Sequence, residues 1–308
     1  MPFLRRVTAG RNVPETRLLR VAQHYHAAGG RSPINDQCRT LLQALGAELS
    51  ELALRLYWGN RNWHPLLEDT LAAMRDDGID QAVALVTSAY GGYSSCRQYL
   101  EDIERARAAV GPGAPVVDKL RLFYNHPGWV GPWVTSLQRA LEEVDEPEGG
   151  GTVVLFSAHS VPEAMPEAGL YAAQVRETAR LVAEGAGLAL GQWRLVWQSR
   201  SGSPGSAWLE PDVCDAVLAS EAGAVVVVPL GFVSDHMEVL HDLDVEAAAA
   251  ARKRGARFVR AATVSTDPAF VAMVRELVQE RSDPSMPRRA LGRYGPWPDD
   301  CPGGHCLA

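Results

Sequence analysis

Short apolar runs recur along the chain and alternate with longer segments in which the apolar residues follow a helical period. The runs predict strands at residues 53–58, 81–88, 114–120, 152–160, 193–199, 224–232 and 257–262. The longer segments predict helices at residues 65–76, 96–109, 131–144, 170–185, 237–254 and 268–281. The runs are nearly continuous in Val, Leu and Ala, as in strands buried on both faces. We therefore predict an α/β fold of parallel sheets covered by helices on both sides.

A polar, glycine-rich segment at residues 143–152 separates two sets of strand and helix units of similar size. We predict two Rossmann-like, doubly wound domains over residues 1–147 and 148–265, with a ligand crevice between them outside the carboxyl ends of the strands. Residues 266–308 are predicted to hold a last helix that packs back on the first domain, followed by an irregular tail. The chain opens on a helix-like segment, whereas a doubly wound domain begins with a strand. We therefore expect the first strand of the first domain to be missing.

Composition narrows the function classes. Of the 308 residues, 46% are hydrophobic and 22% are charged, which are normal values for a globular protein. The net charge of -7 argues against a nucleic-acid partner, because neutralising phosphates needs an excess of Lys and Arg. No apolar stretch has the length of a signal peptide or a transmembrane segment, so we expect a soluble, cytoplasmic protein. The signatures of dinucleotide, NTP and α/β-hydrolase sites are also absent.

The first candidate for chemistry is His159, which ends the apolar run TVVLFSAH. Reactive groups of α/β folds lie at the carboxyl ends of strands. A neutral imidazole there can bind a divalent metal or accept a proton near neutral pH. The alternative is a histidine that only makes a structural hydrogen bond in the loop after the strand.

The second candidate is a row of carboxylates. Glu238, Asp242 and Glu246 are spaced at i, i+4 and i+8 in a predicted helix and would line one face of it. No Lys or Arg occurs between residues 201 and 251 to offset them, and such an oxygen-lined track suits divalent cations. The alternative is a capping box of Asp235 and Glu238, which would explain Glu238 alone.

Six separated motifs together resemble the ferrochelatases, in that family's order and over almost the whole chain. They are GGRSPIN (29–35), GNRNWHP (59–65), YSSCRQY (93–99), FSAHSVP (156–162), WQSR with WLEP (197–200 and 208–211) and PLGFVSDHMEVLHDLD (229–244). The resemblance implies the chelatase fold, with a porphyrin held in the cleft between the two domains. It also implies that His159 and Glu238 face each other across the metal-insertion site.

The resemblance assigns further residues. Asp242 and Glu246 would continue the metal site of His159 and Glu238 as an acidic track. Ser32, Tyr25 and Tyr99 fall at positions that contact the porphyrin in the bacterial coproporphyrin-using branch, and Arg61 matches a cleft arginine that could pair with a ligand carboxylate.

The function implied is insertion of Fe²⁺ into coproporphyrin III to give coproheme in haem biosynthesis, by a protein that we expect to be a monomer. The alternatives are a protoporphyrin IX ferrochelatase, a chelatase for another metal, and a truncated, non-catalytic tetrapyrrole-binding relative.

The cysteines have a separate interpretation. Five cysteines in a chain of this size are not a secreted disulfide framework. Some members of the resembled family hold a [2Fe-2S] cluster by cysteines near the C-terminus and one from the first domain. The resemblance then implies Cys96, Cys301 and Cys306 as ligands, with His305 as a fourth. The alternative is that these are ordinary reduced thiols.

Overall fold

The structure is a computed structural model that describes residues 1–10, 13–144, 150–201 and 205–299. The elements of the first half are α1 (Pro2–Val7), α2 (Glu15–Ala27), α3 (Ile34–Glu48), η1 (Ser50–Leu52), α4 (Leu67–Asp76), β1 (Gln81–Ala84), η2 (Tyr93–Arg97), α5 (Gln98–Val110), β2 (Val116–Lys119) and α6 (Pro127–Glu142). The elements of the second half are β3 (Thr152–His159), α7 (Ala168–Gly185), β4 (Trp193–Gln198), α8 (Val213–Ala219), β5 (Ala224–Val228), α9 (Met237–Val239), η3 (Leu240–Ala247), α10 (Ala248–Lys253), β6 (Arg257–Arg260) and α11 (Pro268–Ser282).

The second half of the chain forms a parallel sheet of strand order β4-β3-β5-β6. Each of its strands lies within one of the predicted apolar runs, so these predictions are confirmed. The central strand β3 pairs with β4 on one side and β5 on the other, and Val154 is in register with both Trp193 and Val226. Every residue of β5 is buried, which explains its unbroken run of Ala and Val.

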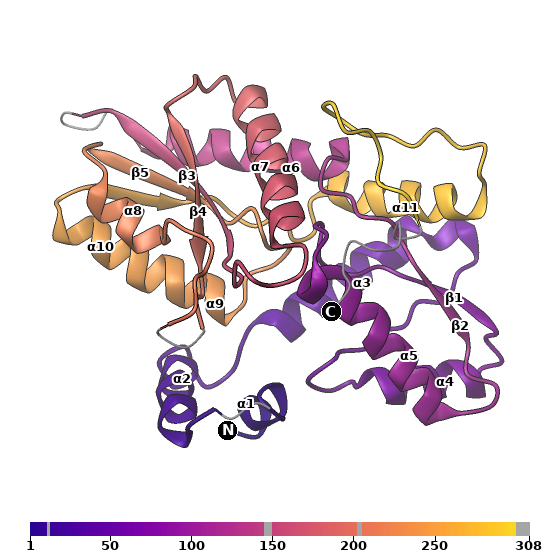
Figure 1. Cartoon of the computed structure of the whole chain (residues 1–308). Coiled ribbons are helices and arrows are strands. Elements are labelled where there is room, and N and C mark those ends of the chain that lie inside the picture. The colour runs from indigo at the N-terminus through magenta and orange to yellow at the C-terminus, as the bar shows by residue number, and fades with distance from the viewer. Residues whose placement is uncertain (11–12, 145–149, 202–204, 300–308) are drawn as a thin grey trace.

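Successive residues of β3 belong to two different hydrophobic cores, because side chains alternate between the faces of a strand. Val154 and Phe156 lie in a large cluster with residues of α6 and α7. Val153 and Leu155 lie in a second cluster with residues of α8, η3 and α10. Figure 1 shows α6 and α7 on one side of the sheet and α8 and α10 on the other. The second half is therefore the three-layer α/β arrangement predicted from the sequence.

The first half contributes a smaller sheet in the described part of the chain. Strands β1 and β2 run parallel, with Gln81 opposite Val116. The strand predicted at residues 53–58 is wrong, because no described strand pairs with this segment and the Leu54 side chain is 46% exposed. A short apolar run forms a strand only where a neighbouring strand can satisfy its backbone groups.

The two halves are joined by more than one contact. Helix α11 packs against both α3 and α6, and α6 packs against α7 and β5. Asn125, just before α6, donates hydrogen bonds through Nδ2 to the carbonyl oxygens of Leu291 and Gly295 beyond α11. Helices α6 and α11 thus contact elements on both sides of the predicted domain boundaries. The division into residues 1–147, 148–265 and 266–308 stays a prediction.

Helices α1 and α2 pack on each other through a small core of Leu4, Leu18 and Ala22. In Figure 1 they lie below α9, at the foot of the second sheet. The imidazole rings of His24 in α2 and His241 in η3 are stacked, with 3.6 Å between their centroids. This contact brings α2 to the carboxyl end of the second sheet. No helix in the described ranges has the length and apolar character needed to cross a bilayer.

Candidate active site

His159 is the last residue of β3, and hydrogen bonds fix both its backbone and its ring. Its ring Nδ1 lies 2.5 Å from the carbonyl oxygen of Ser160. Because a carbonyl oxygen only accepts, Nδ1 must carry a proton, and the neutral ring keeps its free lone pair on Nε2. The hydroxyl of Tyr171 in α7 donates to the carbonyl oxygen of His159 at 3.1 Å. His159 therefore presents an Nε2 atom able to accept a proton or bind a metal.

Glu238 in α9 faces that nitrogen. Its Oε2 atom lies 3.8 Å from His159 Nε2, and its side chain is 54% exposed. Nitrogen and oxygen ligands of a divalent zinc ion stand about 2.0 to 2.2 Å from the metal, so two ligands of one such ion are roughly 3 to 4 Å apart. The observed separation falls within that range. The structure thus brings together the two residues that the sequence singled out.

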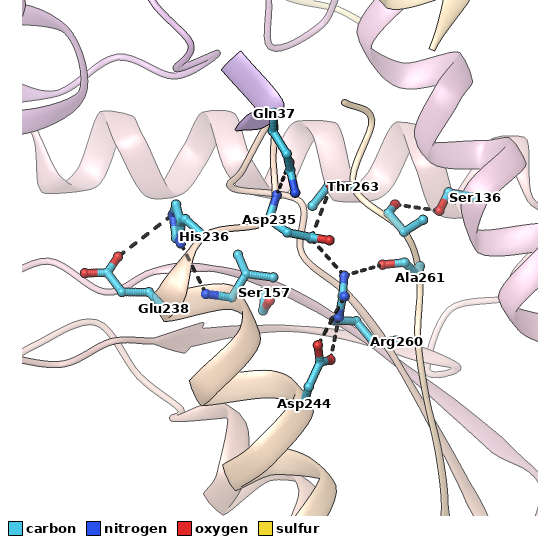
Figure 2. Close-up of polar contacts among 12 residues, drawn as sticks. Gln37, Ser136, Ser157, Asp235, His236, Glu238, Asp244, Arg260, Ala261 and Thr263 are labelled. Carbon is cyan, nitrogen blue, oxygen red and sulfur yellow. Dashed lines mark hydrogen bonds and ion pairs between the residues drawn. The ribbon is translucent and has the colours of Figure 1, made fainter. Parts of the chain in front are cut away.

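His236 is a third member of this group that the sequence analysis did not single out. Its Nε2 atom lies 4.0 Å from Glu238 Oε2, and its Nδ1 accepts the backbone N–H of Val239 at 3.2 Å. Figure 2 shows the His236 ring facing the Glu238 carboxylate. Burial lowers the pKa of His236, only partly opposed by the attraction of Glu238. The signal was present in the sequence, since His236 precedes Glu238 by two residues in the motif SDHME.

The capping box proposed as the structural alternative for Glu238 is wrong. The N-cap of α9 is His236, through the hydrogen bond of its ring to Val239. The Asp235 backbone N–H, which a capping box would pair with Glu238, instead donates to Oε1 of Gln37 in α3 at 2.9 Å. Asp235 is therefore not the N-cap, and Glu238 does not accept the N–H that a capping box would give it.

Asp242 and Glu246 lie further along the same element, but in a π-helix, η3, rather than an α-helix. Asp242 accepts a hydrogen bond from the hydroxyl of Ser199 and is 3.4 Å from Nε2 of Gln198. Burial raises the pKa of Asp242 to about 6; the Ser199 hydrogen bond opposes this shift and repulsion from Glu238 and Glu246 adds to it. The carboxyl therefore gains and loses its proton much closer to neutral pH than an ordinary aspartate does.

Glu246 pairs with Nε2 of His241 at 3.4 Å. The two carboxylates of the expected acidic track thus interact with different side chains, Asp242 with Ser199 and Glu246 with His241. Among the residues with described structure, no group of three or more His, Cys, Asp or Glu is arranged to hold a metal ion. A metal site made of His159, Glu238, Asp242 and Glu246 together stays a prediction.

Tyr25 is the one predicted porphyrin contact with an electrostatic link to the His159 and Glu238 pair. It lies in α2, and its ring packs 6.0 Å from that of Phe3. Burial raises the pKa of Tyr25 to about 12, and the nearby charge of Glu238 adds to the shift. The phenol therefore stays protonated beside the carboxylate.

The other three predicted contacts interact within the first half of the chain. The Ser32 hydroxyl accepts the backbone N–H of Ile34 at 3.3 Å, next to the start of α3. The Arg61 guanidinium lies over the ring of Tyr99, 4.4 Å from its centroid, and pairs with the buried carboxylate of Asp102. The charge of Arg61 is thus already partnered.

The cluster residues are only partly described. Cys96 has a free thiol and is buried in the large hydrophobic cluster of α6 and α7. Cys301, His305 and Cys306 lie outside the described residues.

Comparison with known proteins identifies the family of the chain. A family model described as Ferrochelatase matches residues 1–282. The chain is 47% identical to the Ferrochelatase of Rhodopirellula baltica, over 100% of this chain and 88% of that protein. It is 50% identical to the Coproporphyrin III ferrochelatase of Frankia alni, over 99% of this chain and 81% of that protein. It is 46% identical to the Coproporphyrin III ferrochelatase of Streptomyces griseus, over 100% and 89%.

Solved structures support the fold. SirB from Bacillus subtilis, in a structure with Fe³⁺, has a TM-score of 0.51 at 13% identity and covers 79% of this chain and 90% of its own. CbiX, described as the terminal enzyme of sirohaem biosynthesis in denitrifying bacteria, also has a TM-score of 0.51, at 16% identity, covering 80% and 92%. These likenesses confirm the chelatase-type α/β fold. The family model that matches residues 1–282, and the relatives that are 46 to 50% identical over nearly the whole chain, show that the chain belongs to the ferrochelatase family.

Proposed function

We propose that this chain inserts ferrous iron into coproporphyrin III, and that His159 and Glu238 carry out the insertion. The observation that carries the proposal is the separation of 3.8 Å between His159 Nε2 and Glu238 Oε2. The choice of coproporphyrin III follows the relatives from Frankia alni and Streptomyces griseus, which are coproporphyrin III ferrochelatases.

The chemistry explains why these residue types are needed. A free-base porphyrin holds N–H protons inside a planar ring, so insertion requires those protons to be removed and a hydrated ferrous ion to lose water. The free lone pair of His159 and the carboxylate of Glu238 can divide these tasks between proton acceptance and iron binding. Glu238 is half exposed and can rotate away from His159 when a macrocycle enters. Both divisions of labour between the two residues are compatible with this geometry.

The neighbouring residues support the same reaction. Asp242, with its pKa near 6, can pass on protons close to the site, and Glu246 extends the carboxylates along η3 as a route for a cation or a proton. Tyr25 stays protonated beside Glu238 and offers a hydroxyl and an aromatic face to a flat ligand. Ser32, Tyr99 and Arg61 complete the proposed porphyrin contacts. Since Arg61 already pairs with Asp102, its main contribution would be to hold the Tyr99 ring.

An anaerobic insertion assay tests the proposal. The purified protein is mixed with ferrous iron and with either coproporphyrin III or protoporphyrin IX, and the visible bands of the macrocycle are followed. We expect faster iron insertion into coproporphyrin III than into protoporphyrin IX. The two macrocycles differ in that coproporphyrin III carries more propionate groups. Faster insertion into protoporphyrin IX would overturn the substrate assignment. Binding of both macrocycles without insertion into either would favour a tetrapyrrole-binding protein without catalysis.

A [2Fe-2S] cluster bound by Cys96, Cys301, Cys306 and His305 is a separate proposal. It is supported by the resemblance and by the free thiol of Cys96, which is buried among apolar side chains. We expect anaerobically purified protein to contain stoichiometric iron and acid-labile sulfide, both of which disappear in Cys96→Ser. Colourless protein without sulfide would contradict the proposal.

A further inference from the structure

Glu238 stands in the first turn of a continuous helical segment made of α9, η3 and α10, which contains a π-helical stretch at Leu240–Ala247. The first backbone N–H groups of a helix have no partner within the helix, and π-helical stretches are rare and frequently lie at functional sites. Contacts from other elements to this first turn therefore help to set the direction of the Glu238 carboxylate. We call residues 235–244 the Glu238 segment.

Arg260, at the end of β6, contacts this segment at both of its ends. Its Nη1 donates to Oδ1 of Asp235 at 3.1 Å. Its Nε and Nη2 donate to the two carboxylate oxygens of Asp244, at 2.6 and 3.2 Å. Figure 2 shows the guanidinium between the two carboxylates. One side chain, only 16% exposed, thus joins the residue three positions before Glu238 to the residue six positions after it.

Asp235 is held from two further directions. Its Oδ1 also accepts the hydroxyl of Thr263 at 3.2 Å, and its backbone N–H donates to Oε1 of Gln37 at 2.9 Å. Gln37 belongs to α3, in the first half of the chain, whereas Arg260 ends β6 of the second sheet and Thr263 follows that strand. Asp235 is therefore a junction between the two halves, placed directly before the residues that face His159.

Arg260 also supplies charge that the segment lacks. The Glu238 segment carries the carboxylates of Asp235, Glu238, Asp242 and Asp244, and it contains no Lys or Arg. Carboxylates crowded on one element repel each other, more strongly where they are partly removed from water. The guanidinium of Arg260 offsets the charges of Asp235 and Asp244. Among the described residues, Glu238 and Asp242 form no salt bridge with a Lys or Arg. Those two carboxylates are the ones proposed to act on iron and protons.

We propose that Arg260 is a positioning residue for metal insertion: its guanidinium ties Asp235 to Asp244 and so holds the Glu238 carboxylate opposite His159. The inference rests on the proposed function. An arginine suits this role better than a lysine, because its planar fork bonds both oxygens of Asp244 while a further N–H reaches Asp235.

The test compares Arg260→Ala, Arg260→Lys and a matched control, Arg275→Ala, in the iron insertion assay. Arg275 also bridges two carboxylates, those of Glu48 and Glu51, but it joins α11 to the end of α3. We expect Arg260→Ala to lower kcat roughly 10- to 100-fold, as small displacements of catalytic groups do. Porphyrin binding, followed by the quenching of porphyrin fluorescence, should change less than about twofold, because Arg260 touches none of the proposed porphyrin contacts. Arg260→Lys should fall between wild type and Arg260→Ala, and Arg275→Ala should keep the wild-type kcat.

Chemical rescue of Arg260→Ala by guanidinium ion distinguishes a positioning role of Arg260 from a general loss of structure in the variant. Arg260 lines a surface pocket of about 190 Å³ together with Arg139 and Thr263. This opening gives a guanidinium ion access to the space that Arg260→Ala would leave. We expect guanidinium salt, at concentrations far below those that unfold the protein, to restore part of the kcat of Arg260→Ala, and sodium chloride at equal ionic strength to restore none.

Four outcomes decide the matter. If wild type inserts iron and Arg260→Ala keeps its full kcat, the inference is wrong and the proposed function stands. If Arg260→Ala loses activity but neither lysine nor guanidinium recovers any of it, the positioning role is also overturned. If Arg260→Ala does not fold, Arg260→Lys and Asp244→Asn take its place, and full kcat in both would overturn the inference. An inactive wild type would remove the proposed function itself, and the inference with it.

Discussion

Replacing His159 with alanine is expected to lower the rate of iron insertion roughly 100- to 10,000-fold, the range found for general acid–base residues. The ring is held by the Ser160 carbonyl at Nδ1, so its only free lone pair is on Nε2, 3.8 Å from Glu238. The neighbouring His236 cannot take over this role, because its Nδ1 accepts the Val239 N–H and its neutral ring therefore carries the proton on Nε2. Water cannot replace a fixed base or ligand there. The measurement is the turnover number with ferrous iron and coproporphyrin III under anaerobic conditions.

Controls for this experiment are available in the same chain. His26→Ala removes an exposed histidine of α2 and should leave turnover unchanged. Glu238→Gln keeps the size of the side chain but removes its charge, and we expect a loss of similar size to that of His159→Ala. The exposed Glu221 gives the matched control Glu221→Gln. His159→Ala with more than about a tenth of wild-type turnover would contradict the role assigned to this residue.

The largest expected effect on stability comes from Glu280→Gln. Arg121 and Glu280 form an ion pair whose side chains are 1% and 2% exposed, with bonds of 2.6 and 3.0 Å. Arg121 Nη2 also donates to the carbonyl oxygen of Arg289 at 3.0 Å. Neutralising one partner leaves a buried, uncompensated charge, which costs about 3 to 5 kcal/mol. Urea denaturation of wild type and variant measures the difference in the free energy of unfolding.

Two further variants sharpen this prediction. Arg281→Ala breaks a neighbouring pair with Asp118 whose side chains are 30% and 53% exposed, and it should cost less than about 1 kcal/mol. The double variant Arg121→Met with Glu280→Leu removes both charges and should regain most of the stability lost in Glu280→Gln, because apolar residues of similar volume need no partner. A change below about 1 kcal/mol in Glu280→Gln would show that the pair is not buried in solution.

The second sheet could be predicted from the sequence because its central strands, β3 and β5, are buried almost throughout. Runs such as AVVVV at residues 224–228 are apolar at every position, and a strand covered on both faces needs that pattern. The run ALRLYW at residues 53–58 is also mostly apolar, but it forms no strand. Whether such a run finds a neighbour to pair with depends on the tertiary arrangement, which a local pattern does not contain.

The candidate site was predictable in part for a similar reason. The ends of parallel strands meet at one edge of a sheet, so the position of His159 followed from its place in the sequence, and the resemblance supplied Glu238. The π-helix at residues 240–247 could not be predicted, because a helical period of charges looks alike in both kinds of helix. The contact of Arg260 with Asp235 and Asp244 could not be predicted from the sequence either, for a different reason. Its partners are 25 and 16 residues away in the chain, and only the pairing of β5 with β6 brings them together.

The large hydrophobic cluster has a consequence for how the chain can be divided. Leu41 and Tyr90, from the first predicted domain, are buried in the same cluster as Phe156 and Leu277. The Tyr90 hydroxyl, moreover, donates across the halves to the carbonyl oxygen of Leu230 at 2.9 Å. A fragment ending near residue 147 would therefore expose its part of this hydrophobic cluster to water. Both halves of the chain thus contribute to one hydrophobic cluster, and we expect neither half to fold without the other.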